Sequence, residues 1–211
     1  MKVLESSATR YDKGIKIISF GKINKIYDQI SNYITPGCKV LDIGCGTGAI
    51  SLRVAQKGAD VTGIDINPEM ISICKEKADK LGLQENLTLI EKGVAELTTT
   101  QDKTYDFLTC GLSLSELSYD ELKYAFREAH RLLKDSGKLI IIDEVVPKNI
   151  FKRILHQFIR IPTIIIAYIL TQTTTHAIKN LPEKLELHNF KIETEQYIFL
   201  GSMTFIVSSK E

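Results

Sequence analysis

Short β-branched runs alternate with helical patterns from residue 38 onward, and this alternation is the strongest constraint on the fold. Helices are expected at about 49–57, 68–81 and 118–134, each between two expected strands. Strands connected through helices of this length imply right-handed crossovers and a parallel sheet, hence an α/β fold. The expected strands are Lys39–Ile43, Asp60–Ile64, Leu87–Glu91, Tyr105–Cys110 and Lys138–Asp143.

Capping signals mark the ends of the second and third helices. In each case a residue that can accept hydrogen bonds from free backbone amides precedes the helix, and a glycine follows it. A proline at the first helical position strengthens one prediction, and a serine three residues before a glutamate gives the other helix a capping box. These residues are Asn67, Pro68 and Gly82 around the second helix, and Ser118, Glu121 and Gly137 around the third.

The end of the chain follows a different pattern. A helix is expected near 182–188, followed by two strands, "KIETEQYIFL" (191–200) and "MTFIVSSK" (203–210). A tight turn at Gly201–Ser202 is expected to join them. Strands joined so closely pair antiparallel, so the sheet is expected to close with an antiparallel hairpin.

Length and charge limit the class of protein. A chain of 211 residues that is 44% apolar and 25% charged can bury a sizeable core as one domain, 1–211. Its 27 lysines and arginines nearly cancel its 26 aspartates and glutamates, so no global field attracts nucleic acid. The N-terminal stretch "MKVLESSATRYDKG" lacks the apolar core of a signal peptide.

The four cysteines argue against a metal site and a disulfide framework. None has C-x-x-C spacing and none pairs with a nearby histidine, which favours reduced thiols in a cytoplasmic protein. Cys45 is a candidate nucleophile because it lies inside the glycine loop described next. A buried packing role is favoured over it, because no histidine or lysine flanks Cys45 to stabilise a thiolate.

A glycine-rich loop follows the first expected strand, in "VLDIGCGTGAISL" (40–52). Gly44, Gly46 and Gly48 stand at alternate positions before a helix, which is typical of a nucleotide-binding crevice at the carboxyl end of a strand. Glycines remove side chains, so a ligand can lie directly on the backbone. About twenty residues later Asp65 ends the second strand, where its carboxylate can accept both hydroxyls of a ribose.

Two classes of ligand fit this loop. As G-x-G-x-x-A, with Ala49 at the last position, the loop could carry a dinucleotide pyrophosphate on the helix N-terminus. However, an acid, Asp42, precedes the first glycine. A carboxylate there would repel a pyrophosphate, whereas it suits a ligand that carries an ammonium group and a sulfonium.

The stretch "LDIGCGTG" resembles motif I of the class I S-adenosylmethionine-dependent methyltransferases, and "GIDIN" resembles the acidic segment that follows it. The resemblance covers about 38–145 and the final hairpin. It implies a Rossmann-like seven-stranded methyltransferase sheet with helices on both faces, S-adenosyl-L-methionine as cofactor, and no metal. The expected regions are an N-terminal helical cap or lid (1–37), the cofactor-binding core (38–145), an acceptor-side helical cover (146–181), and the last helix with the hairpin (182–211).

The resemblance also implies roles for the residues of the loop. Asp42 would hold the methionine ammonium, directly or through water. Gly44 and Gly46, with Cys45 between them, would face the methionyl and ribose parts. Asp65 would take the ribose hydroxyls.

Five further residues are implied around the rest of the cofactor. Ile66 would lie against the adenine and Met70 near the same ring, although ordinary core packing is an equal alternative for both. In "GVAEL" the family usually has an acid where this chain has Val94, so the adenine would rely on the backbone of Ala95 and on apolar contact. Cys110, or alternatively its neighbour Gly111, would lie beside the methionine moiety.

The acceptor side lacks a histidine pair that many small-molecule members carry, and has Ser115 and Glu116 there. Glu116 is predicted to reach the rim of the cleft as a general base, as a counter-charge to a cationic acceptor, or merely as a helix first-turn acid. Tyr11, in "RYDKGI", would lie near the sulfonium if this segment folds as a lid; a plain capping helix is equally expected. Asp143 and Glu144 end the fifth strand, at the ligand edge of the sheet.

Segment 145–182 contains no acid and is locally basic. Its apolar run, Ile154–Leu170, is interrupted by Arg160 and Pro162 and falls short of a membrane span. We interpret the segment as a helical cover for an apolar acceptor or a docking surface for a partner; contact with a membrane surface through 148–170 is the alternative. Its cations are Lys148, Lys152, Arg153, Arg160 and Lys179, and its isolated histidines, His156 and His176, are too few for a metal site.

Several stretches, among them "VLESSATRYDKGIKI" and "DEVVPKNIFKRIL", are similar to corrinoid-protein-associated methyltransferases over nearly the full chain. They more distantly resemble quinone-biosynthesis methyltransferases. The closer likeness implies a cobalt corrinoid, held by a partner protein, as the methyl acceptor, and reduced cobalt needs no general base. The alternatives are a quinone, a phenol or another small apolar acceptor, or a cofactor-binding module without turnover.

Overall fold

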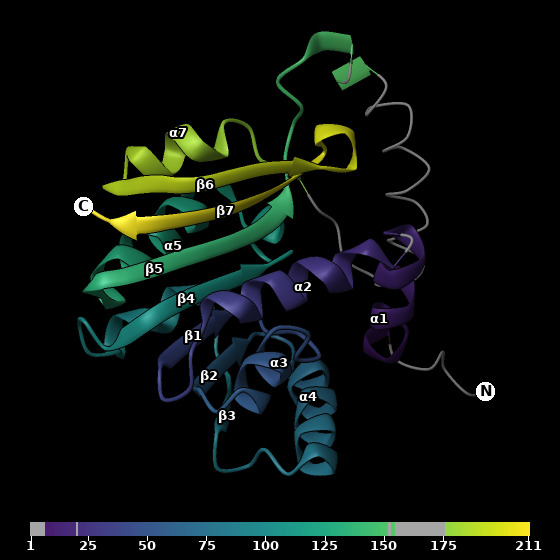
Figure 1. Cartoon of the computed structure of the whole chain (residues 1–211), viewed down its shortest axis with the longest axis vertical. Helices are drawn as coiled ribbons and strands as arrows, with labels where there is room; N and C mark the ends of the chain where they lie inside the picture. The colour runs from purple at the N-terminus through teal and green to yellow at the C-terminus, as the bar shows by residue number, and fades with distance from the viewer. Residues whose placement is uncertain (1–6, 20, 152, 155–175) are drawn as a thin grey trace.

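The computed structural model describes residues 7–19, 21–151, 153–154 and 176–211 (Figure 1). The strands are β1 (Lys39–Ile43), β2 (Asp60–Asp65), β3 (Leu87–Glu91), β4 (Tyr105–Gly111), β5 (Leu133–Glu144), β6 (Phe190–Ile198) and β7 (Met203–Lys210). They form one seven-stranded sheet in the order β3-β2-β1-β4-β5-β7-β6. Strands β1 to β5 pair in parallel, and β7 lies antiparallel between β5 and β6. The predicted α/β class, the seven-stranded sheet and the antiparallel hairpin are therefore confirmed.

Helices cover both faces of this sheet (Figure 1). The α-helices are α1 (Ser7–Ile18), α2 (Lys22–Tyr33), α3 (Ser51–Gln56), α4 (Pro68–Leu81), α5 (Tyr119–Leu132) and α7 (Leu181–Glu186). The short 3-10 helices are η1 (Val94–Thr99), η2 (Leu114–Glu116) and η3 (Phe199–Gly201). Figure 1 shows α2 and α3 on the near side of the sheet and α5 and α7 on the far side.

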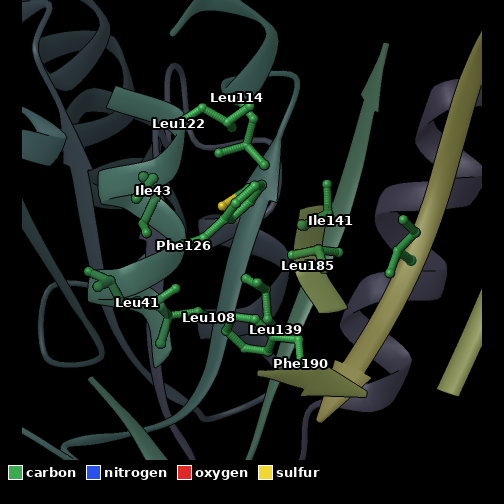
Figure 2. Close-up of a cluster of buried hydrophobic side chains, with 14 of the residues drawn as sticks. Leu41, Ile43, Leu108, Leu114, Leu122, Phe126, Leu139, Ile141, Leu185 and Phe190 are labelled. Carbon is green, nitrogen blue, oxygen red and sulfur yellow. The ribbon is translucent and has the colours of Figure 1, made fainter. Parts of the chain in front are cut away.

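The central strand β5 is buried on both faces, and its side chains divide between two cores. Leu139 and Ile141 join the core under α5 and α7, where Phe126 and Leu185 meet them (Figure 2). Ile140 and Ile142 point to the opposite core, which α2, α3 and α4 cover. Because side chains alternate across a strand, an uninterrupted apolar run is what a doubly covered strand requires.

The predicted caps of α4 are confirmed. Asn67 Oδ1 accepts a hydrogen bond from Glu69 N at 2.9 Å, Pro68 occupies the first turn, and Gly82 ends the helix with φ +68°. The capping box of α5 is also present, because Ser118 and Glu121 exchange both bonds between side chain and backbone.

The prediction that Gly137 follows the end of α5 is wrong. The helix ends at Leu132, and β5 begins at once when Leu133 pairs with Tyr105. Gly137 lies inside β5, where an added Cβ would stand 2.8 Å from Leu133 Cδ2 and 2.9 Å from the Lys134 carbonyl oxygen. A close backbone approach, and not a helix cap, explains this glycine.

The hairpin turn also differs in detail. Ile198 pairs with Met203, so the connection comprises 199–202 and is longer than the two-residue turn predicted at Gly201–Ser202. Phe199 and Leu200 have positive φ values of 49° and 61°, which bulky side chains rarely adopt and propensity does not signal.

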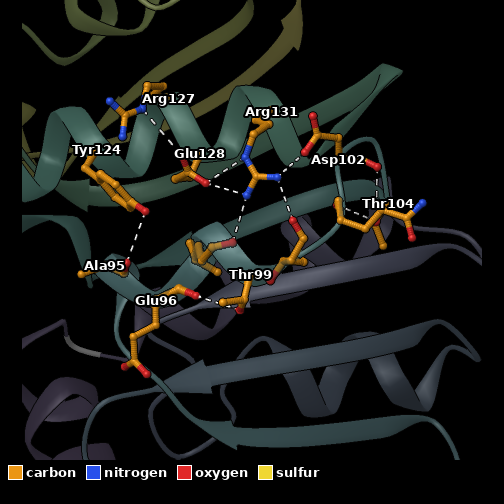
Figure 3. Close-up of polar contacts among 12 residues, drawn as sticks. Ala95, Glu96, Thr99, Asp102, Thr104, Tyr124, Arg127, Glu128 and Arg131 are labelled. Atoms are coloured by element: carbon orange, nitrogen blue, oxygen red, sulfur yellow. Dashed lines mark hydrogen bonds and ion pairs between the residues drawn. The ribbon is translucent and has the colours of Figure 1, made fainter.

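A polar cluster fastens α5 to η1 (Figure 3). The guanidinium of Arg131 donates to Glu128 Oε2 at 2.9 and 2.6 Å, to the Thr100 carbonyl at 2.7 Å and to the Leu97 carbonyl at 2.9 Å, and it also pairs with Asp102. The Glu128 side chain is only 4% exposed. This cluster holds η1, which carries Val94 and Ala95, beside the end of β3.

In the part of the chain that the structure describes, no helix is long and apolar enough to cross a membrane. The predictions for Lys152, His156 and Arg160, and most of the apolar run Ile154–Leu170, lie outside the described residues.

Candidate functional site

The glycine loop lies at the carboxyl end of β1, and its three glycines serve different purposes. All have positive φ, at 70° for Gly44, 53° for Gly46 and 88° for Gly48. A Cβ on Gly44 would lie 2.3 Å from Ser113 Cβ, and one on Gly48 would lie 2.5 Å from Cys74 Sγ. A Cβ on Gly46 would meet nothing within 4 Å. Two glycines therefore permit close packing, and Gly46 leaves open space above the loop.

Asp65 links the end of β2 to this loop. Its Oδ2 accepts a hydrogen bond from Gly46 N at 2.9 Å, and its Oδ1 accepts one from Asn67 N at 2.8 Å. A carboxylate has about four acceptor positions, and each oxygen of Asp65 accepts one bond from the described residues, so each keeps a second position. The spacing between loop and acid thus has a direct cause, and these second positions suit a vicinal diol.

Next to Asp65 lies an exposed apolar surface, here called the shelf, which Ile66 and Ala95 form. Ile66 is 78% exposed, which is unusual for a large apolar side chain, and its Cδ1 lies 3.7 Å from the position of a Cβ on Gly93. Ala95 is exposed nearby along η1, and its carbonyl accepts a hydrogen bond from the Tyr124 hydroxyl at 3.2 Å (Figure 3). Val94 is half-buried and packs against the core. The shelf suits a flat aromatic ring.

Asp42 points into the protein. It is 1% exposed, and its carboxylate accepts hydrogen bonds from Ser51 N at 3.2 Å, Ser51 Oγ at 2.5 Å and Thr109 Oγ1 at 2.7 Å. Burial raises the pKa of Asp42, and these hydrogen bonds oppose the rise. The observed role of Asp42 is to hold the start of α3 against β4, and its predicted contact with a methionine ammonium stays a prediction.

Three other predicted cofactor residues also turn their side chains inward. Cys45, Met70 and Cys110 are 5%, 6% and 2% exposed, so only their peptide groups are left to line a cleft. Burial raises the pKa of Cys110, and contact with the thiol of Cys74 together with burial raises that of Cys45. Protonated buried thiols agree with packing and not with a nucleophile.

Helix α1 is fastened over the glycine loop through Asp12. Asp12 Oδ1 accepts a hydrogen bond from Thr47 Oγ1 at 2.5 Å, and its Oδ2 lies 2.6 Å from Lys77 Nζ. Lys77 also donates to the Thr47 carbonyl at 3.1 Å. The sequence analysis missed Asp12 and Lys77, because no local pattern distinguishes them from other charged residues.

This fastening brings Tyr11 close to the carboxyl groups at the edge of the sheet. Burial raises the pKa of Tyr11, followed by the charges of Tyr27, Glu116, Asp143 and Asp65. The phenol therefore stays protonated among groups that come from α2, η2, β5 and β2. The structure thus assembles Tyr11 and Glu116, which are far apart in sequence, at one edge of the sheet.

The side chain of Asp143 holds η2 in place through hydrogen bonds to its backbone. It is fully buried, and it accepts hydrogen bonds from Leu114 N at 2.8 Å, Ser115 N at 3.2 Å and Glu144 N at 2.7 Å. Burial raises its pKa to about 6, against the effect of these bonds. Ser115 is buried too, and its carbonyl accepts a hydrogen bond from the backbone of His176 at 2.7 Å.

Glu116 is the carboxyl group that η2 presents outward. It is exposed, yet burial of its inner side and then the charges of Asp143 and Asp65 raise its pKa to about 7. It precedes the N-cap of α5, Ser118, and the first-turn acids of that helix are others, Asp120 and Glu121. Glu116 is instead a first-turn acid of the short helix η2, so the predicted helix-acid alternative is met there. Among the described residues, no group of three or more histidines, cysteines or acids could hold a metal ion.

The chain was then compared with known proteins. A family model described as "Methyltransferase domain" matches residues 34–196. The ubiquinone/menaquinone biosynthesis C-methyltransferase UbiE of Allorhizobium ampelinum is 31% identical over 148 residues, and the match covers 67% of this chain and 56% of that protein. UbiE of Rickettsia felis is 31% identical over 172 residues, covering 77% of this chain and 68% of that protein.

Solved structures share the fold. The magnesium protoporphyrin IX methyltransferase (ChlM) from Synechocystis with bound SAH has a TM-score of 0.70 and 21% identity, over 94% of this chain and 86% of that chain. The [4+2]-cyclase SpnF also has a TM-score of 0.70, at 18% identity over 89% of this chain and 80% of that chain. A methyltransferase and a cyclase share this fold, so the acceptor chemistry has to be argued from the site itself.

Proposed function

The chain belongs to the methyltransferase-domain family and is an S-adenosylmethionine-dependent methyltransferase. From this premise we propose that it methylates a ring carbon of an apolar quinol or phenol. The observation that carries the proposal is Glu116, a carboxyl group with a pKa of about 7 at the edge where the cofactor elements meet. The names of the UbiE relatives support the same acceptor class. When bound, the cofactor supplies an electrophilic methyl group on a sulfonium.

Three features of this chain are suited to holding the cofactor. Asp65 accepts the ribose hydroxyls with the positions that Gly46 and Asn67 leave free. Gly46 provides the open space for the ligand backbone, and Ile66 provides the exposed apolar surface for the adenine. Helix α1, fastened through Asp12, limits the access of water.

A ring carbon of a quinol becomes a good nucleophile only when a neighbouring hydroxyl loses its proton. Glu116 takes this proton, since a base with a pKa near 7 is partly ionised at neutral pH and still strong enough to accept it. Tyr11 stays protonated and orients the acceptor oxygen by donating a hydrogen bond. As the carbon–carbon bond forms, the methyl–sulfur bond breaks and S-adenosylhomocysteine is the leaving group. The ring carbon then releases its proton to solvent, which restores the aromatic ring as a phenolate, and Glu116 returns its proton to the phenolate oxygen.

This proposal replaces the corrinoid acceptor that the sequence resemblance favoured. The curated relatives reported above are named as quinone C-methyltransferases and not as corrinoid-associated proteins. A carboxyl group with a pKa near neutrality can also take the proton from an acceptor that must lose one. Reduced cobalt needs no such deprotonation. A quinol is thus the better match to both observations.

Methyl transfer to a panel of acceptors tests the proposal. With labelled S-adenosylmethionine, we expect turnover on reduced naphthoquinones and benzoquinones that lack a ring methyl to exceed that on the oxidised forms and on cob(I)alamin by about tenfold or more. Mass spectrometry should place the label on carbon. A preference for cob(I)alamin would restore the corrinoid acceptor, and cofactor binding with no transfer to any acceptor would indicate a binding module.

The pH dependence of turnover tests the role of Glu116. Because the base acts as a carboxylate, kcat should rise as pH increases through about 7 and then level off. Glu116→Gln should lower kcat by about 10²–10⁴-fold and remove this rise. The matched control is Glu121→Gln, an exposed acid whose capping bond glutamine can keep, and it should retain the wild-type profile. An unchanged profile in Glu116→Gln would exclude it as the base.

A further inference from the structure

A cleft of about 410 Å³ opens beyond the carboxyl end of β5. It is formed by the segment that leaves β5, by a turn of helix that begins at residue 150, and by the start of α7. The cleft-lining residues are Val146, Pro147, Lys148, Arg153, Lys179, Asn180 and Glu183.

The charge in this cleft is mainly positive. Lys148 Nζ lies 3.4 Å from Glu183 Oε1 and 3.9 Å from Glu195 Oε1, so the charge of this lysine is largely compensated. Arg153 and Lys179 are exposed, and neither forms an ion pair with another described residue. Two cations without an acidic partner among the described residues therefore flank the cleft.

Large apolar side chains are exposed beside these cations. Ile150 and Phe151 are 59% and 80% exposed on the turn that begins at residue 150, and Ile154 is 48% exposed one turn later. Leu200, at the tip of the β6–β7 hairpin, is 63% exposed. Figure 1 shows this turn and η3 projecting from the same end of the sheet. The protein thus presents an apolar projection with cations around it.

We propose that this face, defined by Ile150, Phe151, Arg153, Lys179 and Leu200, docks on the surface of an anionic lipid bilayer. Apolar side chains on a projecting turn can enter the boundary between headgroups and acyl chains, while arginine and lysine bind the lipid phosphates. The inference rests on the proposed function for its purpose, since an apolar quinol is concentrated in membranes.

Charge and shape together favour lipid over a protein partner. Arg153 and Lys179, which pair with no acid in the described part of the chain, complement a negatively charged surface. An aromatic side chain that is 80% exposed on a projection, and not recessed in a groove, suits a soft surface that can close around it. An acidic protein would need a hollow of matching shape, and it is the alternative outcome of the test.

Sedimentation with vesicles tests this inference. The wild-type protein should bind vesicles of phosphatidylcholine with about one third phosphatidylglycerol, and bind pure phosphatidylcholine much more weakly. Arg153→Gln/Lys179→Gln should lower the partition coefficient for anionic vesicles by roughly thirtyfold, because each cation near the surface contributes about fivefold. Phe151→Ser should weaken binding to both kinds of vesicle.

A matched control removes the same charge elsewhere. Lys75→Gln/Lys80→Gln changes two exposed lysines on α4, which covers β2 and β3 at the opposite edge of the sheet, and should leave binding unchanged. The inference is overturned if the wild type does not sediment, if both double variants bind equally, or if inorganic phosphate at constant ionic strength displaces the protein. Turnover on a water-soluble quinol without vesicles is measured separately, so loss of docking is distinguished from failure of the proposed chemistry.

Discussion

Asp65→Ala should weaken the binding of S-adenosylhomocysteine by about a hundredfold or more. The proposed site gives the ribose two charge-assisted hydrogen bonds from this carboxylate, and each contributes about 1.5–3 kcal/mol. The same carboxylate accepts Gly46 N and Asn67 N, so its removal also releases the loop on which the ligand lies. Isothermal titration calorimetry measures the change directly.

Two variants make this test specific. Asp60→Ala removes the same side chain at the other end of β2, where Asp60 is exposed, and should leave affinity unchanged. Asp65→Asn keeps one carbonyl oxygen and should give an intermediate loss. If Asp65→Ala bound the ligand as tightly as the wild type, the ribose subsite would have to be placed elsewhere.

Arg131→Met should lower the free energy of unfolding by about 3–5 kcal/mol, the usual effect of removing one partner from a buried ion pair. Glu128 is only 4% exposed on its side chain, and Arg131 donates to it twice at 2.9 and 2.6 Å. Methionine keeps much of the apolar stem but leaves the buried glutamate without its two shortest hydrogen bonds and the Thr100 carbonyl without its side-chain donor. The Leu97 carbonyl still accepts a hydrogen bond from Thr100 N at 2.9 Å. Urea denaturation gives the difference in free energy.

Arg127→Met is the matched control for this prediction. Arg127 also faces Glu128, at 3.6 Å, but its side chain is 67% exposed, so its removal should cost less than about 1 kcal/mol. Glu128→Leu/Arg131→Met, which removes both charges, should recover much of the stability lost in the single variant. Equal effects of Arg127→Met and Arg131→Met would contradict the buried-pair explanation.

The sequence predicted the parts of the fold that depend on local preferences. Asn67, Pro68 and Gly82 define α4 because their own backbone conformations and capping groups suit helix ends. The apolar, β-branched run within Lys138–Asp143 predicted a strand there, and the observed β5 contains it but begins earlier, at Leu133. Gly137 misled the prediction because a glycine required for close approach of the backbone looks the same in sequence as a glycine that ends a helix.

The candidate site divides in the same way. By itself, the sequence determined the glycine loop and the acid at Asp65. A strand, a tight loop and the end of the next strand are placed by short-range connections, and the bond from Gly46 N to Asp65 spans only 19 residues.

The docking of α1 was decided by tertiary structure, through bonds from Asp12 to Thr47 and Lys77 across 35 and 65 residues. That docking brings Tyr11 within range of the charge of Glu116. The raised pKa of Glu116 likewise depends first on burial of its carboxyl group and then on the charges of Asp143 and Asp65, and all of these arise only after β5 and β2 join the sheet. Contacts of this range follow from the packing of whole elements, and no local residue pattern encodes them.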